Sequence, residues 1–207
     1  MLLIGLGHKA QNGKDTFADA VVEHWDGRLN IRLASFADPL RAEVADLARE
    51  IWAIKMPHLP FDGKAAMFLL CLEHGVEFDP DAPVDATYPW GKQRKFYQWY
   101  GTEYRRAQND KYWVDKGEEM IRQARRDKVD ALAFRDMRFE NEYDLTGDHG
   151  GWRIKVSRLG WVSNVPPHIS ETALEGHAFD LGLGVKDGQL ALLKRLSVQM
   201  FNNILGV

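Results

Sequence analysis

Apolar residues along the chain form short continuous runs and four-residue repeats, a pattern that predicts strands alternating with helices. Residues 1–6 are a short apolar run followed by a glycine, which is typical of a buried parallel strand. From residue 14 to 25 the apolar positions Phe17, Val21 and Trp25 recur every four residues and predict a helix that Asp26-Gly27 ends. The chain therefore opens with a strand, a glycine-containing loop and a helix.

The same alternation continues downstream. A second strand is expected at 31–36, followed by a helix in which Asp38 can serve as the N-cap and Pro39 fits the first turn. Helices are expected at about 96–106 and 112–126, strands at 129–134 and 153–157, and a last helix from near Gly188. Strands that alternate with helices predict the α/β class, with a parallel sheet covered by helices on both faces.

Residues 55–95 interrupt this alternation. The segment holds five of the eight prolines and the stretch "EFDPDAP", so we expect an irregular insertion. Its apolar content is too low for a core of its own. The sequence therefore predicts one domain over residues 1–207, with an insertion on the acceptor side of the site discussed below.

Composition narrows the possible functions. The formal net charge is −3, so binding to nucleic acid would require a local basic patch rather than a global field. Cys71 is the single cysteine, which excludes an intramolecular disulfide and a cysteine-based zinc cluster and suits a reducing compartment. No apolar run reaches the length of about 18 residues that a membrane span needs, and the start lacks the pattern of a secretion signal. We expect a cytoplasmic protein with no membrane partner.

The loop "GLGHKAQNGKDTFAD", residues 5–19, resembles a phosphate-binding loop with two departures from the strict pattern. His8 stands at the first glycine position, and Asp15 separates Lys14 from Thr16. Backbone N–H groups there can still surround a phosphate at the positive end of the helix, with Lys14 near the β and γ oxygens. Thr16 would help to hold Mg²⁺, and a plain glycine turn is the alternative. The expected ATP-binding residues are Ala10, Gln11, Asn12, Gly13, Lys14, Asp15 and Thr16.

Charged residues after the second and third strands are further candidates. Asp136 lies just past the expected third strand, where ligands of open α/β sheets bind, and its carboxylate can hold Mg²⁺. Arg138 can neutralise charge on a transferring phosphoryl group, although the two side chains could instead form a surface salt bridge. Arg41 lies three residues after Asp38 and so on the same helical face. It can clamp an acceptor phosphate or be an ordinary solvated arginine.

The segment "RKFYQWYGTEYRR", residues 94–106, interleaves cations with aromatic residues. Such a mixture suits stacking on a base while its phosphate is held, and it equally suits a strand of DNA. Phe96, Tyr100 and Trp99 could instead belong to the core. The acceptor-binding candidates in this segment are Gln98, Trp99, Glu103, Arg105 and Arg106, with Gln98 and Glu103 as readers of base edges.

Five segments together make the chain resemble the bacteriophage deoxynucleoside monophosphate kinases, relatives of the nucleoside monophosphate kinases and dephospho-CoA kinase. They are "GKDT" (13–16), "FADPLR" (36–41), "YGTE" with "YWV" (100–103, 112–114), "RDMRFENE" (135–142) and "HISE" (168–171). The resemblance implies a P-loop kinase fold that uses ATP and Mg²⁺, and it tolerates the aspartate in "GKDT". It places His168 and Glu171 near the acceptor and the Asp187-Gly188 turn beside the adenine, although a loop histidine beside prolines is often structural.

Three functions fit these residues. The first is transfer of the γ-phosphoryl of ATP to a deoxynucleoside monophosphate, with Lys14, Asp136 and Arg138 as catalytic residues. The second is phosphorylation of the hydroxyl of 5-hydroxymethyluracil in phage DNA, in which the Asp38 carboxylate takes the proton. The third is a nucleotide-binding regulator without turnover. The expected partner is thus a deoxynucleotide or modified DNA, and a homodimer is a possible assembly.

Overall fold

The chain folds into two units. A computed structural model describes residues 1–7, 9, 11–161 and 168–207. The first unit comprises residues 1–36 and 114–207, and the second comprises residues 37–113. The second unit thus extends on both sides of the segment expected as an insertion. Within the described ranges, no helix has both the length and the apolar character needed to cross a membrane.

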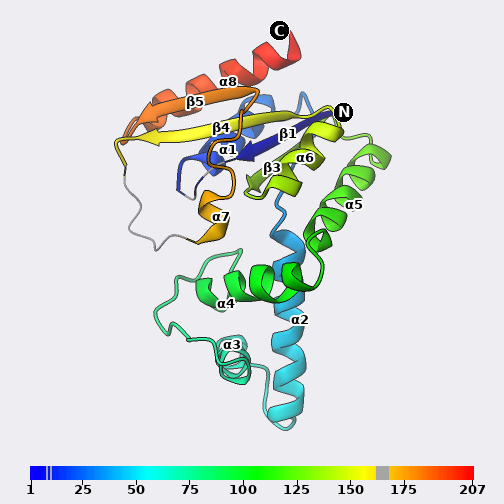
Figure 1. The fold of residues 1–207 in the computed structure, drawn as a ribbon, viewed down its shortest axis with the longest axis vertical. Helices are drawn as coiled ribbons and strands as arrows, with labels where there is room; N and C mark the ends of the chain where they lie inside the picture. The colour runs from blue at the N-terminus through cyan, green and yellow to red at the C-terminus, as the bar shows by residue number, and fades with distance from the viewer. Residues whose placement is uncertain (8, 10, 162–167) are drawn as a thin grey trace. The chain divides into compact units, whose positions relative to one another are not determined.

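The first unit is built on a parallel sheet (Figure 1). Within the described residues the sheet has five strands in the order β2-β3-β1-β4-β5, and every pairing is parallel. This confirms the α/β class expected from the sequence. The strands are β1 Leu2–Gly7, β2 Ile31–Ala34, β3 Ala131–Met137, β4 Trp152–Leu159 and β5 Leu181–Lys186.

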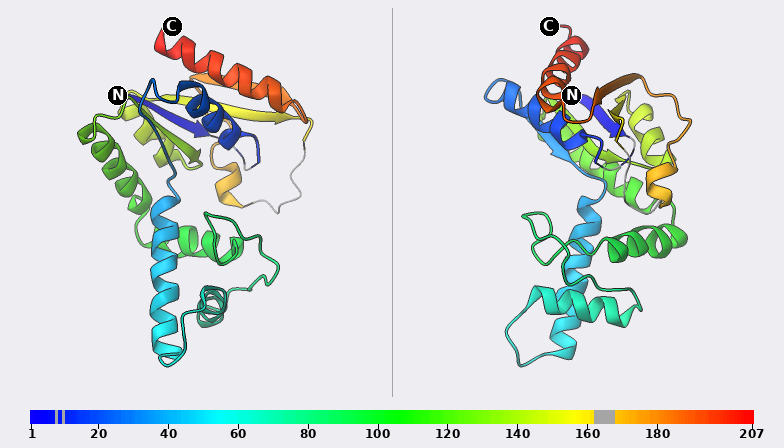
Figure 2. Two further views of the ribbon diagram at one scale, coloured as in Figure 1. Left: turned by 180° about the vertical axis from the view of Figure 1, so that it is seen from behind. Right: turned by 90° about the vertical axis from the view of Figure 1, so that its left-hand side faces the viewer.

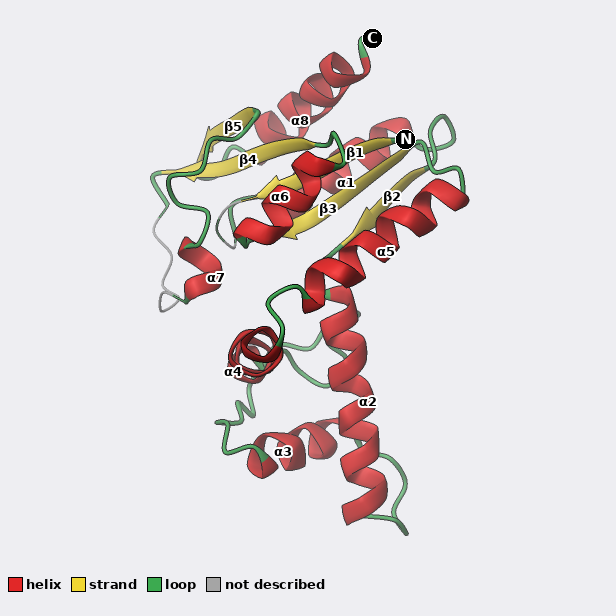
Figure 3. Cartoon of the chain, turned by 45° about the vertical axis from the view of Figure 1, so that its right-hand side comes forward, coloured by secondary structure: helices red, strands yellow, loops and turns green. Residues whose placement is uncertain are grey.

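Helices cover both faces of this sheet (Figure 3). Helices α1 (Lys14–Trp25) and α8 (Leu190–Leu205) pack on one face, and α5 (Tyr112–Arg126) and α6 (Glu140–Asp148) on the other. Side chains of β1 alternate between the two cores, with Ile4 and Leu6 toward α1 and α8 and Leu3 toward the opposite face. A single turn, α7 (Ile169–Thr172), follows the segment outside the described residues.

The second unit is helical (Figure 2) and has its own core. It contains α2 (Asp38–Lys55), α3 (Gly63–Glu73), α4 (Arg94–Gln98) and a π-helix at Trp99–Arg106. Buried side chains of α2 and α3 meet those of α4, the π-helix and Trp113. These core residues are Val44, Ala48, Ile51, Trp52, Ala66, Met67, Leu70, Cys71, Phe96, Tyr100 and Trp113.

Helix α3 corrects the expectation that residues 55–95 are irregular. Asp62 caps this helix by accepting a hydrogen bond from the Ala65 backbone N–H at 3.0 Å. Met67, Leu70 and Cys71 then pack against α2. The prolines of the segment lie outside α3, so they bound the helix without interrupting it.

The expected helix at 96–106 begins at Arg94 and changes to π geometry at Trp99. The wider turn aligns residues five apart, so the Arg105 Nε donates to the Tyr100 hydroxyl at 2.9 Å. Both groups contact the Glu43 carboxylate of α2. Tyr100 and Arg105, part of the aromatic and cationic segment that suggests a ligand surface in the sequence, are therefore turned toward α2.

Candidate functional site

The loop between β1 and α1 turns sharply at Gln11 and Gly13, whose φ angles are 59° and 93°. Gly13 is the N-cap of α1, and a Cβ there would lie 2.6 Å from Leu193 Cδ2. Both the left-handed backbone and this close approach require glycine. The first turn of α1 has backbone N–H groups without intrahelical acceptors, which is the feature that binds phosphates at helix N-termini. His8 and Ala10 lie outside the described residues.

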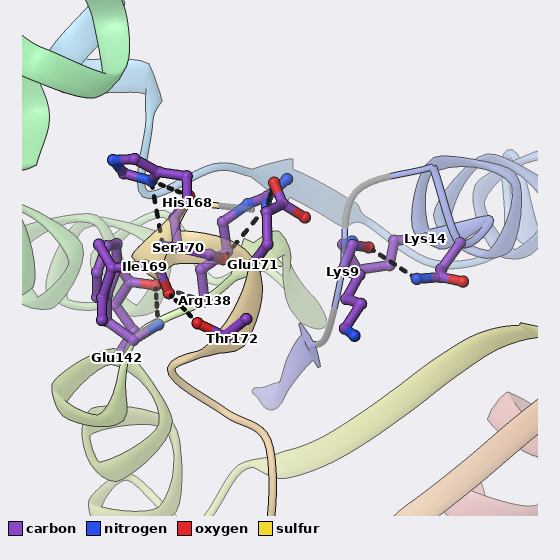
Figure 4. A network of polar contacts seen from close by, with 11 residues as sticks. Lys9, Lys14, Arg138, Glu142, His168, Ile169, Ser170, Glu171 and Thr172 are labelled. Atoms are coloured by element: carbon purple, nitrogen blue, oxygen red, sulfur yellow. Dashed lines mark hydrogen bonds and ion pairs between the residues drawn. The ribbon is translucent and has the colours of Figure 1, made fainter. Parts of the chain in front are cut away.

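Lys14 begins α1 and is only 6% exposed. Its Nζ donates to the Lys9 carbonyl at 2.5 Å (Figure 4). Burial is the main cause that lowers the pKa of Lys14 to about 8, and the Arg138 charge acts in the same direction. Three nearby carboxylates act in the opposite direction, those of Asp136, Asp15 and Glu171. The fold thus gathers Lys14 and several of the predicted site residues within electrostatic reach of one another.

Asp136 lies inside β3 rather than just past it, which corrects the expected strand end. The register with β1 pairs Gly5 with Phe134 and Gly7 with Met137, so two residues of β3 lie opposite one of β1. This bulge prolongs the strand and re-aims the side chain. The Asp136 carboxylate accepts hydrogen bonds from the Ser35 hydroxyl and, at 2.8 Å, from the Phe36 backbone N–H.

Asp136 offers the carboxylate oxygens that a hard cation such as Mg²⁺ prefers, and each oxygen accepts one of these two hydrogen bonds. Thr16 is half-buried in the first turn of α1. Among the described residues no cluster of three or more His, Cys, Asp or Glu side chains could hold a metal ion. A Mg²⁺ ion here would complete its shell with phosphate oxygens and water, as is usual for this ion.

Arg138 follows β3 and is fixed through both its side chain and its backbone. Its Nη1 lies 2.6 Å from Glu171 Oε1, which forms an ion pair between half-buried groups (Figure 4). Its backbone N–H donates to Glu142 Oε2 at 2.7 Å, and that carboxylate is 2% exposed. The partner of Arg138 is therefore Glu171, and not Asp136 as in the alternative of a surface salt bridge.

His168 is the N-cap of α7 and has a clear structural role. Its Nδ1 accepts from the Ser170 backbone N–H at 3.2 Å and lies 2.8 Å from the Ser170 hydroxyl (Figure 4). This cap shapes the turn that carries Glu171 to Arg138. The two "HISE" residues that were predicted near an acceptor thus support Arg138, and a contact of either residue with the acceptor stays a prediction.

The turn predicted to lie beside the adenine is connected to the loop before α1. Asp187 forms an ion pair with Arg158, and the Arg158 backbone N–H donates to Asn12 Oδ1 at 3.0 Å. Gly188, next in the chain, has a φ of 82°. The ends of β4 and β5 are thereby joined to the loop through Asn12, which is 7% exposed.

In the second unit, Asp38 and Arg41 form an ion pair across one turn of α2. Ala37, and not Asp38, is the N-cap of this helix, because Asp38 already has helical geometry and Pro39 occupies the first turn. The Arg41 side chain is 17% exposed, and its Nη1 donates to the Tyr88 hydroxyl at 3.3 Å. Arg41 is therefore a held arginine rather than a freely solvated one.

The remaining candidates lie on α4 and the π-helix. Phe96 and Tyr100 are core residues, which is the alternative to a ligand surface that the sequence left open. Trp99 is partly buried against that core. Arg105 Nη2 lies 3.0 Å from Glu43 Oε2.

The other three candidates differ in exposure: Gln98 and Arg106 are half-buried, and Glu103 is exposed. None of these contacts tests a role in acceptor binding.

The sequence did not single out three polar residues that organise these sites. Ser35 orients Asp136, Glu142 holds the backbone of Arg138, and Glu43 holds Arg105. Ser35 and Glu142 are buried polar residues beside predicted site residues, a signal that becomes visible only once burial is known.

Comparison with known proteins adds no assignment to this geometry. No family model matches the chain, and a search of curated proteins finds no significant similarity. The functional interpretation therefore depends on the residues themselves, above all on the buried Lys14 at the start of α1 and its charged neighbours.

Proposed function

We propose that the chain is a cytoplasmic kinase that transfers the γ-phosphoryl group of ATP to the phosphate of a deoxynucleoside monophosphate. The observation that carries this proposal is the burial of Lys14 at the junction of strand, loop and helix, beside Asp136 and Arg138. Burial lowers the pKa of Lys14, so its charge is disfavoured in the folded protein. The negative charge of a bound polyphosphate would favour the ammonium form.

On the donor side, each residue has a separate role in this proposal. The first turn of α1 binds phosphate oxygens through its backbone, and Lys14 neutralises the β and γ groups. Asp136 and Thr16 would hold Mg²⁺, which would supply positive charge beside the same phosphates. Arg138, kept in place by Glu171 and Glu142, offsets the charge that develops on the transferring group.

On the acceptor side, Arg41 binds the acceptor phosphate. An acceptor phosphate is already anionic, so no general base is needed and catalysis consists of positioning and electrostatic stabilisation. The ion pair of Arg41 with Asp38 supports this role, because it holds the guanidinium in one orientation while further N–H donors remain for a ligand.

The alternative acceptor is the hydroxyl of 5-hydroxymethyluracil in DNA. It requires a base, and the Asp38 carboxylate is a candidate because it is 46% exposed at the start of α2. The two functions share the donor side and differ in the role of this one carboxylate.

The test is incubation with γ-labelled ATP and Mg²⁺, with no acceptor, with each deoxynucleoside monophosphate, and with plain or hydroxymethylated DNA. We expect the label on a deoxynucleoside diphosphate. Label on hydroxymethylated DNA would establish the alternative. ATP binding without any transfer would show that the protein is a nucleotide-binding regulator, and the proposal would then be wrong.

A further inference from the structure

The second unit contains a pocket of about 100 Å³ between α2 and the loop before α4. Two arginines and three aromatic residues line it, namely Arg41, Arg49, Tyr88, Trp90 and Tyr97. All of these residues belong to the second unit. A pocket of this volume has room for water or for a group the size of a phosphate.

Cations surround the aromatic walls of this pocket. The Arg41 guanidinium lies 5.7 Å from the Tyr88 ring centroid, and the Lys92 ammonium lies 4.9 Å from it. The Arg49 guanidinium lies 5.5 Å from the Trp90 ring centroid. In such pairs the cations lie over the ring faces, and N–H groups at the edges of the cations remain as hydrogen-bond donors.

The two arginines have carboxylate partners that an anionic ligand can replace or supplement. Arg49 pairs with Asp46 at 2.8 Å, but both side chains are more than half exposed, so the pair is weak. Arg41 pairs with Asp38 through one nitrogen and reaches the Tyr88 hydroxyl through another. A guanidinium has five N–H donors, so both arginines retain donors for phosphate oxygens.

The loop that forms the far wall is fixed by its own hydrogen bonds. Asp85 accepts from the backbone N–H groups of Thr87 and Tyr88 at 2.7 and 2.8 Å. Gln93, 1% exposed, exchanges two hydrogen bonds of 2.8 Å with the backbone of Asp79. The Tyr88 ring also packs edge-on against Tyr97 at 5.1 Å. The wall is therefore preorganised, which lowers the entropic cost of binding.

We propose that this pocket binds the terminal phosphate of the acceptor nucleotide, with Arg49, Tyr88 and Tyr97 as specificity residues beside Arg41. The inference rests on the proposed function and adds a preference for a monoester phosphate. A terminal phosphate carries close to two charges and enters a small pocket end-on, whereas a phosphodiester carries one charge and continues in both directions. The guanidiniums of Arg41 and Arg49 in so small a volume favour a terminal phosphate over a phosphodiester.

The tyrosine hydroxyls complete the polar lining. Burial raises the pKa of Tyr97, so its phenol stays protonated and can donate a hydrogen bond. Tyr88 accepts from Arg41, and its own hydroxyl hydrogen remains for a ligand oxygen.

The test measures equilibrium binding to the full chain without ATP. The ligands are inorganic phosphate, the four deoxynucleoside monophosphates, the matching nucleosides and the dinucleotide TpT. The variants are Arg49→Gln and Tyr88→Phe. Arg122→Gln is the matched control, because Arg122 on α5 is 54% exposed and paired with a helix neighbour, as Arg49 is at 57%. Thermal unfolding checks that every variant is folded.

We expect at least one monophosphate to bind at least tenfold more tightly than its nucleoside or TpT. Each pocket variant should weaken that binding about tenfold to a hundredfold, the loss typical of a charged or charge-assisted hydrogen bond, and the control should not. Equal binding of nucleoside or TpT, or unchanged binding by folded pocket variants, would overturn the assignment.

Transfer assays on the same proteins separate this inference from the proposed function. If the parent protein transfers phosphate and the pocket variants keep its acceptor KM, the pocket is wrong and the function stands. If monophosphate binding depends on the pocket but no transfer occurs, the pocket stands and the function is wrong.

Discussion

The charge of Lys14 lowers the stability of the folded protein but is needed for the proposed function. Its pKa in the folded protein is about 8 and its ordinary value is 10.5, so folding disfavours its charge. The unfolded chain binds more protons between these values, and stability therefore rises with pH across that window. Below pH 8 the full penalty is present. At neutral pH the folded protein would therefore be more stable without the Lys14 charge.

We predict that Lys14→Met abolishes activity yet stabilises the protein. Transfer should fall at least a hundredfold, because a contact with the reacting phosphates is lost. At pH 7 the free energy of unfolding should rise by about 1–3 kcal/mol, and the gain should shrink as the pH approaches 10.5. Urea unfolding at several pH values measures this gain. A variant that is active, or that is less stable than its parent at pH 7, would contradict this account of Lys14.

The metal-binding role proposed for Asp136 gives a second prediction about a single residue. Asp136→Asn keeps an oxygen that can accept from the Phe36 N–H but loses the charge that attracts Mg²⁺. We expect the Mg²⁺ concentration for half-maximal activity to rise at least tenfold and kcat to fall, with a smaller change in ATP affinity. Superimposable Mg²⁺ titrations of mutant and parent at equal activity would remove Asp136 from the site.

At the scale of elements, the positions of helices and strands are predicted most accurately where the apolar residues follow a single regular spacing. Helices α1 and α5 and strand β1 lie within a residue or two of their expected positions. Strand β5 was missed because two glycines interrupt its apolar residues, and α6 because its buried face includes Glu142 and Thr146. The bulge in β3 and the π-helix depend on pairing partners that are distant in the sequence.

The candidate site follows the same division. Asp136, expected just past β3, lies within that strand, but the positions of Gly13 and Lys14 between β1 and α1 were predictable. The supporting residues of the site were not, since Ser35 and Glu142 meet Asp136 and Arg138 only through tertiary structure. The pocket beside Arg41 likewise depends on a loop that has no regular structure.

The π-helix gives a prediction about stability. Glu43 accepts from Arg105, Tyr100 and Tyr112; Tyr100 is buried and the other three side chains are half-buried. Arg105→Met keeps the aliphatic stem but leaves a half-buried carboxylate without its cation. We expect a loss of about 1–3 kcal/mol in unfolding free energy. Arg126→Met on α5, a surface arginine that is 56% exposed, is the control and should change little. Equal stability of both variants would mean that Arg105 has no structural role.

At the scale of the whole molecule, the Asp38→Asn variant distinguishes the two proposed acceptors. With a monophosphate acceptor, Asp38→Asn should keep most activity, because the attacking oxygen is already charged. With a hydroxymethyl acceptor, the loss of the base should reduce kcat roughly a hundredfold to ten-thousandfold. Steady-state rates on the best substrate measure the difference. A collapse of activity with the fold intact, together with phosphate on hydroxymethylated DNA in the parent reaction, would establish the second function.

The central claim is that the chain moves the γ-phosphoryl group of ATP to a deoxynucleoside monophosphate. The most direct measurement follows γ-labelled ATP with Mg²⁺ and the four monophosphates, and it identifies the labelled product for the parent protein and for Lys14→Met. We expect a labelled deoxynucleoside diphosphate in the parent reaction and at least a hundredfold less with the variant. No labelled diphosphate from any of the four monophosphates, with a folded parent protein, would contradict it.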